Sequence, residues 1–148
     1  MVAILLSIHK KYSDLILLGQ KTIEVRRTAI KKNPSIALIY STNSKRIVGA
    51  IKIIQIIRCD RDSFFKSYSE QTCLTKHDYE TYLENCEMVT GIVFGNLIKQ
   101  LDLKLSDLCI KNAPQSFMYV DKCSIILDSL NDSDEDIECA ERIKTQNF

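Results

Sequence analysis

The chain has 148 residues, 45% of them hydrophobic and 26% charged, so it fits one soluble globular domain with an appended segment. The net charge of +1 hides an asymmetry, because residues 1–121 carry a net +5 and residues 122–148 a net −4. Residues 9–46 hold nine cations and two carboxylates, and this net +7 favours an anionic partner. An ordinary solvated surface could have the same composition, so charge alone does not show whether this stretch binds an anion.

The six cysteines are spread along the chain without a CxxC pair, and neither His9 nor His77 has a metal ligand at the usual spacing. We therefore expect free thiols, no metal and no cofactor. No apolar run approaches the ~20 residues of a membrane-spanning helix, and the first residues lack the basic start of a signal peptide. These features predict a cytoplasmic protein without a membrane partner.

The first part of the chain predicts a strand, a helix and a second strand. Val2–Ile8 is a run of branched apolar residues, typical of a buried strand. Apolar residues recur at helical spacing in Lys10–Leu18, and a glycine follows where helices often end. Thr22–Arg27 alternates between apolar and polar residues, so Glu24 and Arg26 should share one strand face.

Two strands and two helices are expected next. Ser35–Tyr40 and Arg46–Ile57 read as strands, and Gly49 inside the second predicts a bend or bulge. One helix should begin at Asp60 or Asp62. Thr75 has the spacing of a capping residue for another helix.

The remaining part predicts strands at Met88–Leu97 and Gln115–Val120, with a helical turn at Leu105–Leu108 opened by Ser106 or Asp107. This order lacks the regular alternation of a parallel sheet. It predicts an α+β fold, a small mixed β-barrel with flanking helices, in residues 1–121. The acidic extension, residues 122–148, is expected to be partly mobile. It could be a solubilising tail, could compete with nucleic acid for the basic face, or could contact a protein partner.

Three polar clusters could bind a ligand. Lys21, Glu24, Arg26 and Arg27 lie at the predicted helix-to-strand junction, where Arg offers a planar fork and Lys a point charge for phosphate. An exposed ion pair worth ~0–1 kcal/mol would explain the same residues, and from spacing alone this interpretation is favoured. The second cluster, Tyr40–Arg46, contains hydroxyls, an amide and two cations that suit phosphates or base edges, and an ordinary surface turn equally well; its ligand candidates are Tyr40, Ser41, Thr42 and Lys45. The third contains Gln115 and Ser116, and a Gln side chain can read a base edge.

Several of these segments together resemble the ASCH domain family. The matching segments are Leu6–Tyr12, Ile16–Arg27, Leu38–Thr42, Ile47–Gly49 and Pro114–Phe117. The last is similar to the closing motif of a subgroup of predicted transcriptional regulators. The resemblance runs from about residue 3 to residue 120 and implies a PUA-like barrel with a cleft at one mouth, associated with RNA binding and regulatory roles.

By resemblance, the cleft is lined by Lys21, Glu24, Arg26 and Arg27, with Tyr40, Ser41, Thr42, Lys45 and Ser116 near it. An amidohydrolase branch of the family uses a Lys, a Thr and a Glu. Lys21 matches the Lys, but Glu24 stands at the Thr position, so that activity is not carried over. A ribonuclease branch uses a Tyr, a Lys and a Ser, roles that Tyr40, Lys45 and Ser116 could fill.

Three functions remain open from the sequence. The first is a binding module for RNA or a nucleotide-like anion, with Glu24 and Gln115 at a base edge and Tyr40 stacking. The second is a metal-independent ribonuclease or modified-nucleoside hydrolase, with Lys21, Glu24, Tyr40, Lys45 and Ser116 as catalytic candidates. The third is a protein-interaction module acting through the acidic tail. The oligomeric state is left open.

Overall fold

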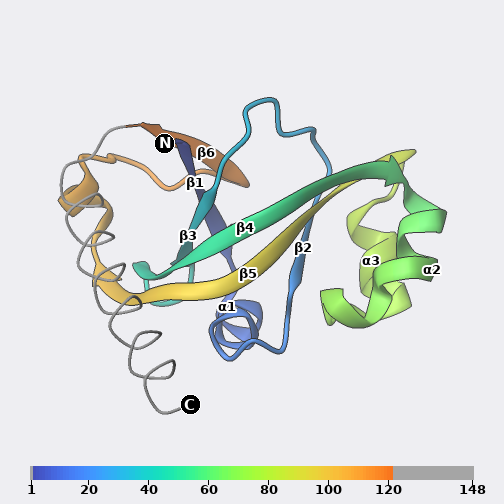
Figure 1. The fold of residues 1–148 in the computed structure, drawn as a ribbon, viewed down its shortest axis with the longest axis horizontal. Helices are drawn as coiled ribbons and strands as arrows, with labels where there is room; N and C mark the ends of the chain where they lie inside the picture. The colour runs from blue at the N-terminus through green and yellow to red at the C-terminus, as the bar shows by residue number, and fades with distance from the viewer. Residues whose placement is uncertain (1, 122–148) are drawn as a thin grey trace, which may run out of the picture.

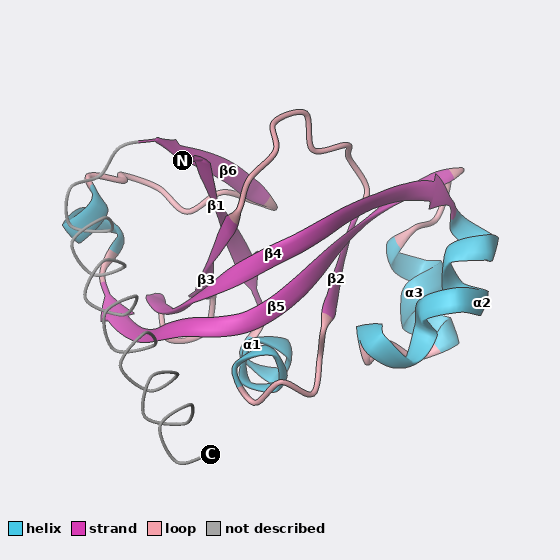
Figure 2. Ribbon diagram, viewed as in Figure 1, coloured by secondary structure: helices cyan, strands magenta, loops and turns pink. Residues whose placement is uncertain are grey.

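The computed structural model describes residues 2–121, so the predicted acidic extension lies outside the described residues. Six strands form one curled sheet in the order β2-β5-β4-β3-β1-β6, and the helices lie at its ends and side (Figure 1). Within the described part of the chain, no helix is long and apolar enough to cross a membrane. The α+β class predicted from the sequence is confirmed (Figure 2).

The sheet is built around β1 (Val2–Ile8), which pairs in parallel with β3 (Ile36–Ser41) and antiparallel with β6 (Phe117–Asp121). The parallel pair requires a crossover, and α1 (Lys10–Leu17) begins it directly after β1. The helix starts at His9, whose side chain accepts a hydrogen bond from a backbone N–H of the first turn.

Two long strands carry the rest of the fold. β4 (Arg46–Asp60) pairs antiparallel with β5 (Met88–Leu103), and the short β2 (Ile23–Arg26) adds to the other side of β5. At one end of this ribbon lie α2 (Arg61–Thr72) and α3 (Lys76–Tyr82), and at the other lies the 3-10 helix η1 (Leu105–Leu108) (Figure 1).

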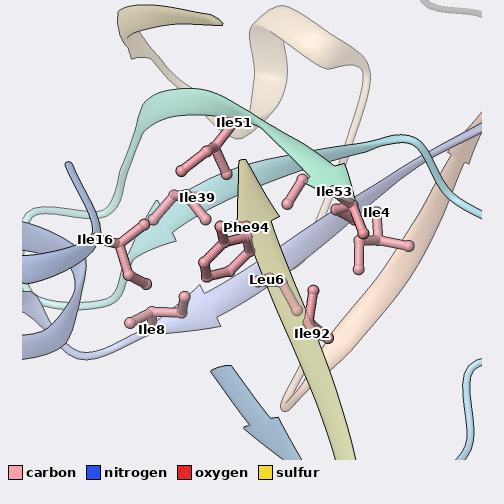
Figure 3. Packing of buried hydrophobic residues seen from close by; sticks show 10 residues of the cluster. Ile4, Leu6, Ile8, Ile16, Ile39, Ile51, Ile53, Ile92 and Phe94 are labelled. Carbon is pink, nitrogen blue, oxygen red and sulfur yellow. The ribbon is translucent and has the colours of Figure 1, made fainter. Parts of the chain in front are cut away.

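Buried apolar residues form two clusters that alternate along the central strands, as period-2 strands require. One cluster includes Leu5, Leu38 and Leu108. The other includes Ile4, Leu6 and Ile16 of α1, together with side chains from β4 and β5 (Figure 3). A third cluster lies under α2 and α3. The sheet is therefore covered on both faces, and the helical end has its own small core.

Helix caps and a bulge confirm several predictions. The Asp60 carboxylate accepts from the Ser63 N–H, and the Thr75 hydroxyl caps α3 in the same way. The β4–β5 register shifts at Gly49, where an added Cβ would lie 2.6 Å from the Leu17 Cδ2 atom. A larger residue at the bulge would therefore force the Leu17 side chain of α1 to move.

Three expectations need correction. The sheet does not close into a barrel, because in the described chain β2 and β6 are its two unpaired edges. β5 continues six residues beyond the predicted end at Leu97, because the facing strand β4 offers hydrogen-bonding partners along that length. The turn η1 has the predicted bounds but is capped at Lys104, two or three residues before the predicted opening residue, with the Asp107 carboxylate accepting from the Lys104 N–H.

Candidate functional site

A recess of about 270 Å³ opens between the end of β1, the start of α1, the edge strand β2 and helix α3. The recess lies beside the unpaired edge of β2. Its wall combines apolar, aromatic, hydroxyl and charged side chains: Ser7, Ile8, His9, Tyr12, Glu24, Val25, Arg26, Leu74, Asp78 and Tyr82. The volume lies just below the ~300–1,000 Å³ of typical small-molecule pockets, so it suits only a small guest.

Glu24 and Arg26 form a buried ion pair in the recess wall. The Arg26 Nη1 and Glu24 Oε1 atoms are 3.1 Å apart, and the two side chains are only 8% and 9% exposed. Ile23 and Val25 point the other way, into the core under α2 and α3. The alternation read from the sequence therefore placed both charges on the correct face.

The same pair satisfies the free edge of β2. Glu24 Oε1 accepts from the Val25 N–H at 2.8 Å, and Arg26 Nη1 donates to the Val25 carbonyl at 2.8 Å. Arg26 Nη2 also donates to the Ser7 carbonyl of β1 at 3.0 Å. The two side chains replace a neighbouring strand, which explains physically why β2 needs no further partner and the barrel stays open.

Most of the hydrogen-bonding capacity of this pair is therefore used within the protein. Both contacts of the Glu24 carboxylate found in the described chain use Oε1, which leaves Oε2 for a donor group of a guest. Arg26 Nε is buried without a hydrogen-bond partner among the described residues. Moving either side chain would break its hydrogen bond to the Val25 peptide. The pair is therefore held in a fixed position in the recess wall and is not free to move onto a phosphate.

Lys21 lies behind this wall. It is 1% exposed, its amine donates to the Thr72 carbonyl at the end of α2, and it lies 5.2 Å from the centre of the Tyr12 ring. Burial lowers the pKa of the Lys21 amine, and the nearby Glu24 carboxylate offsets part of this effect. The amine thus contacts α1 through Tyr12 and α2 through Thr72, and the same tyrosine lines the recess.

Two tyrosines at the recess make cation–π contacts with basic side chains. The Arg27 Cζ atom lies 4.8 Å from the centre of the Tyr82 ring, and the Lys11 Nζ atom lies 5.4 Å from that of Tyr12. Arg27 and Lys11 are exposed, whereas both tyrosines are half-buried. The rim therefore offers flat apolar surface next to accessible positive charge, which suits a base and its phosphate.

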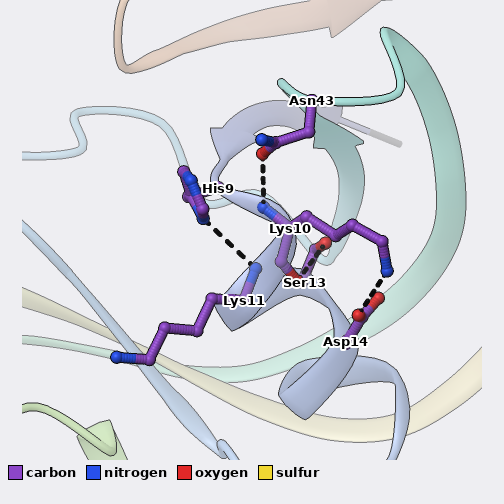
Figure 4. Close-up of polar contacts among 6 residues, drawn as sticks. All are labelled: His9, Lys10, Lys11, Ser13, Asp14 and Asn43. Atoms are coloured by element: carbon purple, nitrogen blue, oxygen red, sulfur yellow. Dashed lines mark hydrogen bonds and ion pairs between the residues drawn. The ribbon is translucent and has the colours of Figure 1, made fainter.

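The start of α1 forms the neighbouring rim. His9 Nδ1 accepts from the Lys11 N–H at 3.3 Å, and the Asn43 side-chain oxygen accepts from the Lys10 N–H at 2.9 Å (Figure 4). The Lys10 amine pairs with Asp14 at 2.6 Å. These contacts fix the turn after β3 against the helix and leave the His9 ring at the recess.

The other predicted residues lie outside the recess lining. Tyr40 is buried in the first core cluster, and Ser41 is 2% exposed with a hydroxyl that has no partner in the described chain. Thr42 and Lys45 are exposed in the turn after β3, and Gln115 is exposed before β6. Tyr40 and the half-buried Ser116 flank Ser7: Ser7 pairs with Tyr40, and the Ser7 N–H donates to the Ser116 carbonyl at 3.1 Å.

Sequence reasoning missed five polar or aromatic residues of the recess: Ser7, His9, Tyr12, Asp78 and Tyr82. Ser7, His9 and Tyr12 fall in the Leu6–Tyr12 segment that resembles the family, but none of them was assigned to the cleft. The helical pattern did locate α3, but nothing in it indicates that α3 faces the end of β1. For Tyr12 the available signal was its position directly after Lys10 and Lys11, whereas Tyr82 has no adjacent basic residue in the sequence.

A family model for the ASCH domain matches residues 6–98. The chain belongs to the ASCH domain family. These residues run from β1 into β5 and include every residue of the recess. ASCH domains are generally thought to bind RNA. The match identifies the family but does not support membership of the predicted transcriptional-regulator subgroup.

Solved structures of an ASCH protein from Zymomonas mobilis have the same fold. One aligns with a TM-score of 0.75 at 22% identity and covers 88% of this chain and 94% of that one. A tyrosine-to-phenylalanine variant of that protein aligns with a TM-score of 0.73 at 23% identity, covering 81% of this chain and 91% of the other. A comparison with curated protein sequences finds no match. At these identities the structural likeness concerns the fold alone.

Proposed function

We propose that this ASCH domain binds single-stranded RNA, or a nucleotide-like anion, at the recess and acts as a regulatory module in transcription or RNA metabolism. The observation that carries the proposal is Tyr82, which lines the recess and holds the exposed Arg27 guanidinium on its ring at 4.8 Å. Stacked bases and phosphates are recognised by this combination of aromatic ring and cation.

Each part of the recess has a place in this proposal. Tyr82 stacks on a base, and Arg27 pairs with the adjoining phosphate. Glu24 Oε2 accepts from an amino group on the base edge, and Arg26 holds Glu24 in position. Lys21, which is buried and bonded to Thr72, supports the wall without touching the ligand. The proposal places the protein in the cytoplasm, where the four described cysteines, all free, stay reduced.

Fluorescence anisotropy with a labelled single-stranded oligoribonucleotide tests this proposal across a salt series. We expect binding to weaken with salt by a log–log slope of about 0.7 for each phosphate neutralised. Arg27→Ala should weaken binding and lower the slope by about that amount. Lys104→Ala is the matched control, because Lys104 is exposed at η1, outside the recess lining. Equal losses in the two variants would contradict the proposed site.

A metal-independent ribonuclease is the second candidate function. It is favoured by one observation: Tyr40 of β3 and Ser116, directly before β6, lie on either side of Ser7. Neighbouring strands are ~4.8 Å apart, so the two side chains start about 10 Å from each other. Lys45 follows in the turn after β3.

Labelled RNA incubated with the protein in the presence of a chelator tests this second candidate on a gel. Cleavage that is lost in Tyr40→Phe and in Ser116→Ala would favour it. RNA that remains intact with the wild-type protein across several substrates would count against it.

A further inference from the structure

The loop that leaves β2 carries a second set of aromatic and cationic contacts beyond the recess. Residues 27–32, Arg-Thr-Ala-Ile-Lys-Lys, contain three cations and no carboxylate. The loop starts at Arg27, on the recess rim, and reaches Tyr119 of β6, where the Lys31 N–H donates to the Tyr119 hydroxyl at 2.9 Å and the Lys32 N–H at 3.4 Å. The loop thus crosses between the two unpaired edges of the sheet (Figure 1).

Contacts hold this loop along its length. At its start, Arg58 Nη1 donates to the Arg27 carbonyl at 2.9 Å, and the Thr90 hydroxyl donates to the Thr28 carbonyl at 2.7 Å. At its end, the Ser35 N–H donates to the Val2 carbonyl of β1 at 3.1 Å. A loop fixed in this way loses little further conformational entropy when it binds a partner.

The far end of the loop repeats the arrangement of the recess rim. The Lys32 Nζ atom lies 5.0 Å from the centre of the Tyr119 ring, as Arg27 lies over Tyr82. Phe117 contacts Tyr119 edge-on, with ring centres 5.8 Å apart, so the far end also offers aromatic surface. Lys31 and Lys32 are exposed, and Tyr119 is half-buried.

We infer that residues 27–32 form a track for the phosphate backbone of a bound single strand, leading from the recess to a second contact point at Lys31, Lys32 and Tyr119. The inference rests on the proposed function and specifies its substrate: an oligonucleotide of several nucleotides rather than a mononucleotide. Arg27 and Lys32 are five residues apart, so the track spans at most about 17 Å. Affinity should therefore rise with RNA length over the first few nucleotides and then level off.

The inference is tested by anisotropy with a series of labelled oligouridylates, from a dinucleotide to an octanucleotide, in the full chain. The double variant Lys31→Ala/Lys32→Ala keeps both backbone N–H groups that hold Tyr119, so the loop should stay in place. We expect it to bind the dinucleotide like the wild type but to lose the gain in affinity with length. Its salt slope on the octanucleotide should fall by about 1.4, that is 0.7 for each of two phosphates.

The control is Lys104→Ala/Lys111→Ala, which removes two exposed cations flanking η1. A length dependence in the Lys31/Lys32 variant equal to that of the wild type overturns the track while leaving the recess proposal intact. An equal loss in the control variant also overturns it, because the effect would then be general charge. If the wild type binds no member of the series, the proposed function and the track fail together.

Discussion

The wall and the rim of the recess use charged residues in opposite ways, although both come from one basic stretch of the sequence. In the wall, Glu24 and Arg26 are buried and hydrogen-bonded to the protein's own backbone, as is Lys21 behind it. At the rim, Arg27 and Lys11 are exposed and lie over tyrosine rings. Sequence position alone does not separate the two groups, yet burial ties the first to the fold and leaves the second exposed, where we propose that RNA binds.

The comparison predicts its largest effect for a wall residue. Arg26→Leu leaves the Glu24 carboxylate buried without its partner and the Val25 and Ser7 carbonyls without their donor. Loss of one partner of a buried pair costs about 3–5 kcal/mol in free energy of unfolding. Urea denaturation followed by circular dichroism measures this loss.

The control for Arg26→Leu is Lys10→Ala, which removes an exposed ion pair with Asp14. That pair joins residues four apart on a helix, so its loss should cost only about 0.5 kcal/mol. If the two variants lost similar stability, the buried pair would not be the structural element described above.

A change at Tyr82, which lies under the exposed Arg27, should lower RNA affinity rather than stability. Tyr82→Ala removes the ring that lines the recess and supports Arg27, so RNA affinity should fall by the ~1–3 kcal/mol of one stacked base. Tyr82→Phe keeps the ring and should bind almost like the wild type. Anisotropy with a labelled oligonucleotide measures both variants, and equal losses would show that stacking is not the interaction involved.

A smaller effect is expected for Lys21, visible as a dependence of stability on pH. Burial lowers the pKa of the folded-state amine below the 10.5 of the free side chain. Between these two pKa values the unfolded chain binds a proton that the folded chain does not, so stability should rise with pH in that window. In Lys21→Met this contribution should be absent. Urea midpoints at several pH values up to 10.5 measure it, and an identical pH profile in both proteins would contradict the assigned burial.

Much of the fold could be predicted from local patterns. The alternation in Thr22–Arg27 identified β2 and the shared face of Glu24 and Arg26, and capping side chains located the starts of α2 and α3. Barrel closure was predicted wrongly, because it depends on whether the edge of β2 finds a strand or its own side chains. No local pattern in the sequence indicates which of these two partners the edge of β2 has.

The site was only partly predictable for a similar reason. Glu24 and Arg26 were found because they are charged and adjacent on a strand. Tyr82 could not be assigned, since its place at the recess depends on how α3 is held at the end of the β4–β5 ribbon. The predicted roles of Tyr40, Lys45, Gln115 and Ser116 remain predictions.

The most direct test of the rim as the binding surface is a titration of ¹⁵N-labelled protein with an unlabelled oligoribonucleotide, followed by amide chemical shifts. We expect the largest changes at recess and rim residues such as His9, Tyr12, Arg27 and Tyr82, with no change around η1. Shifts concentrated at η1, or the absence of any shift at saturating RNA, would contradict the account.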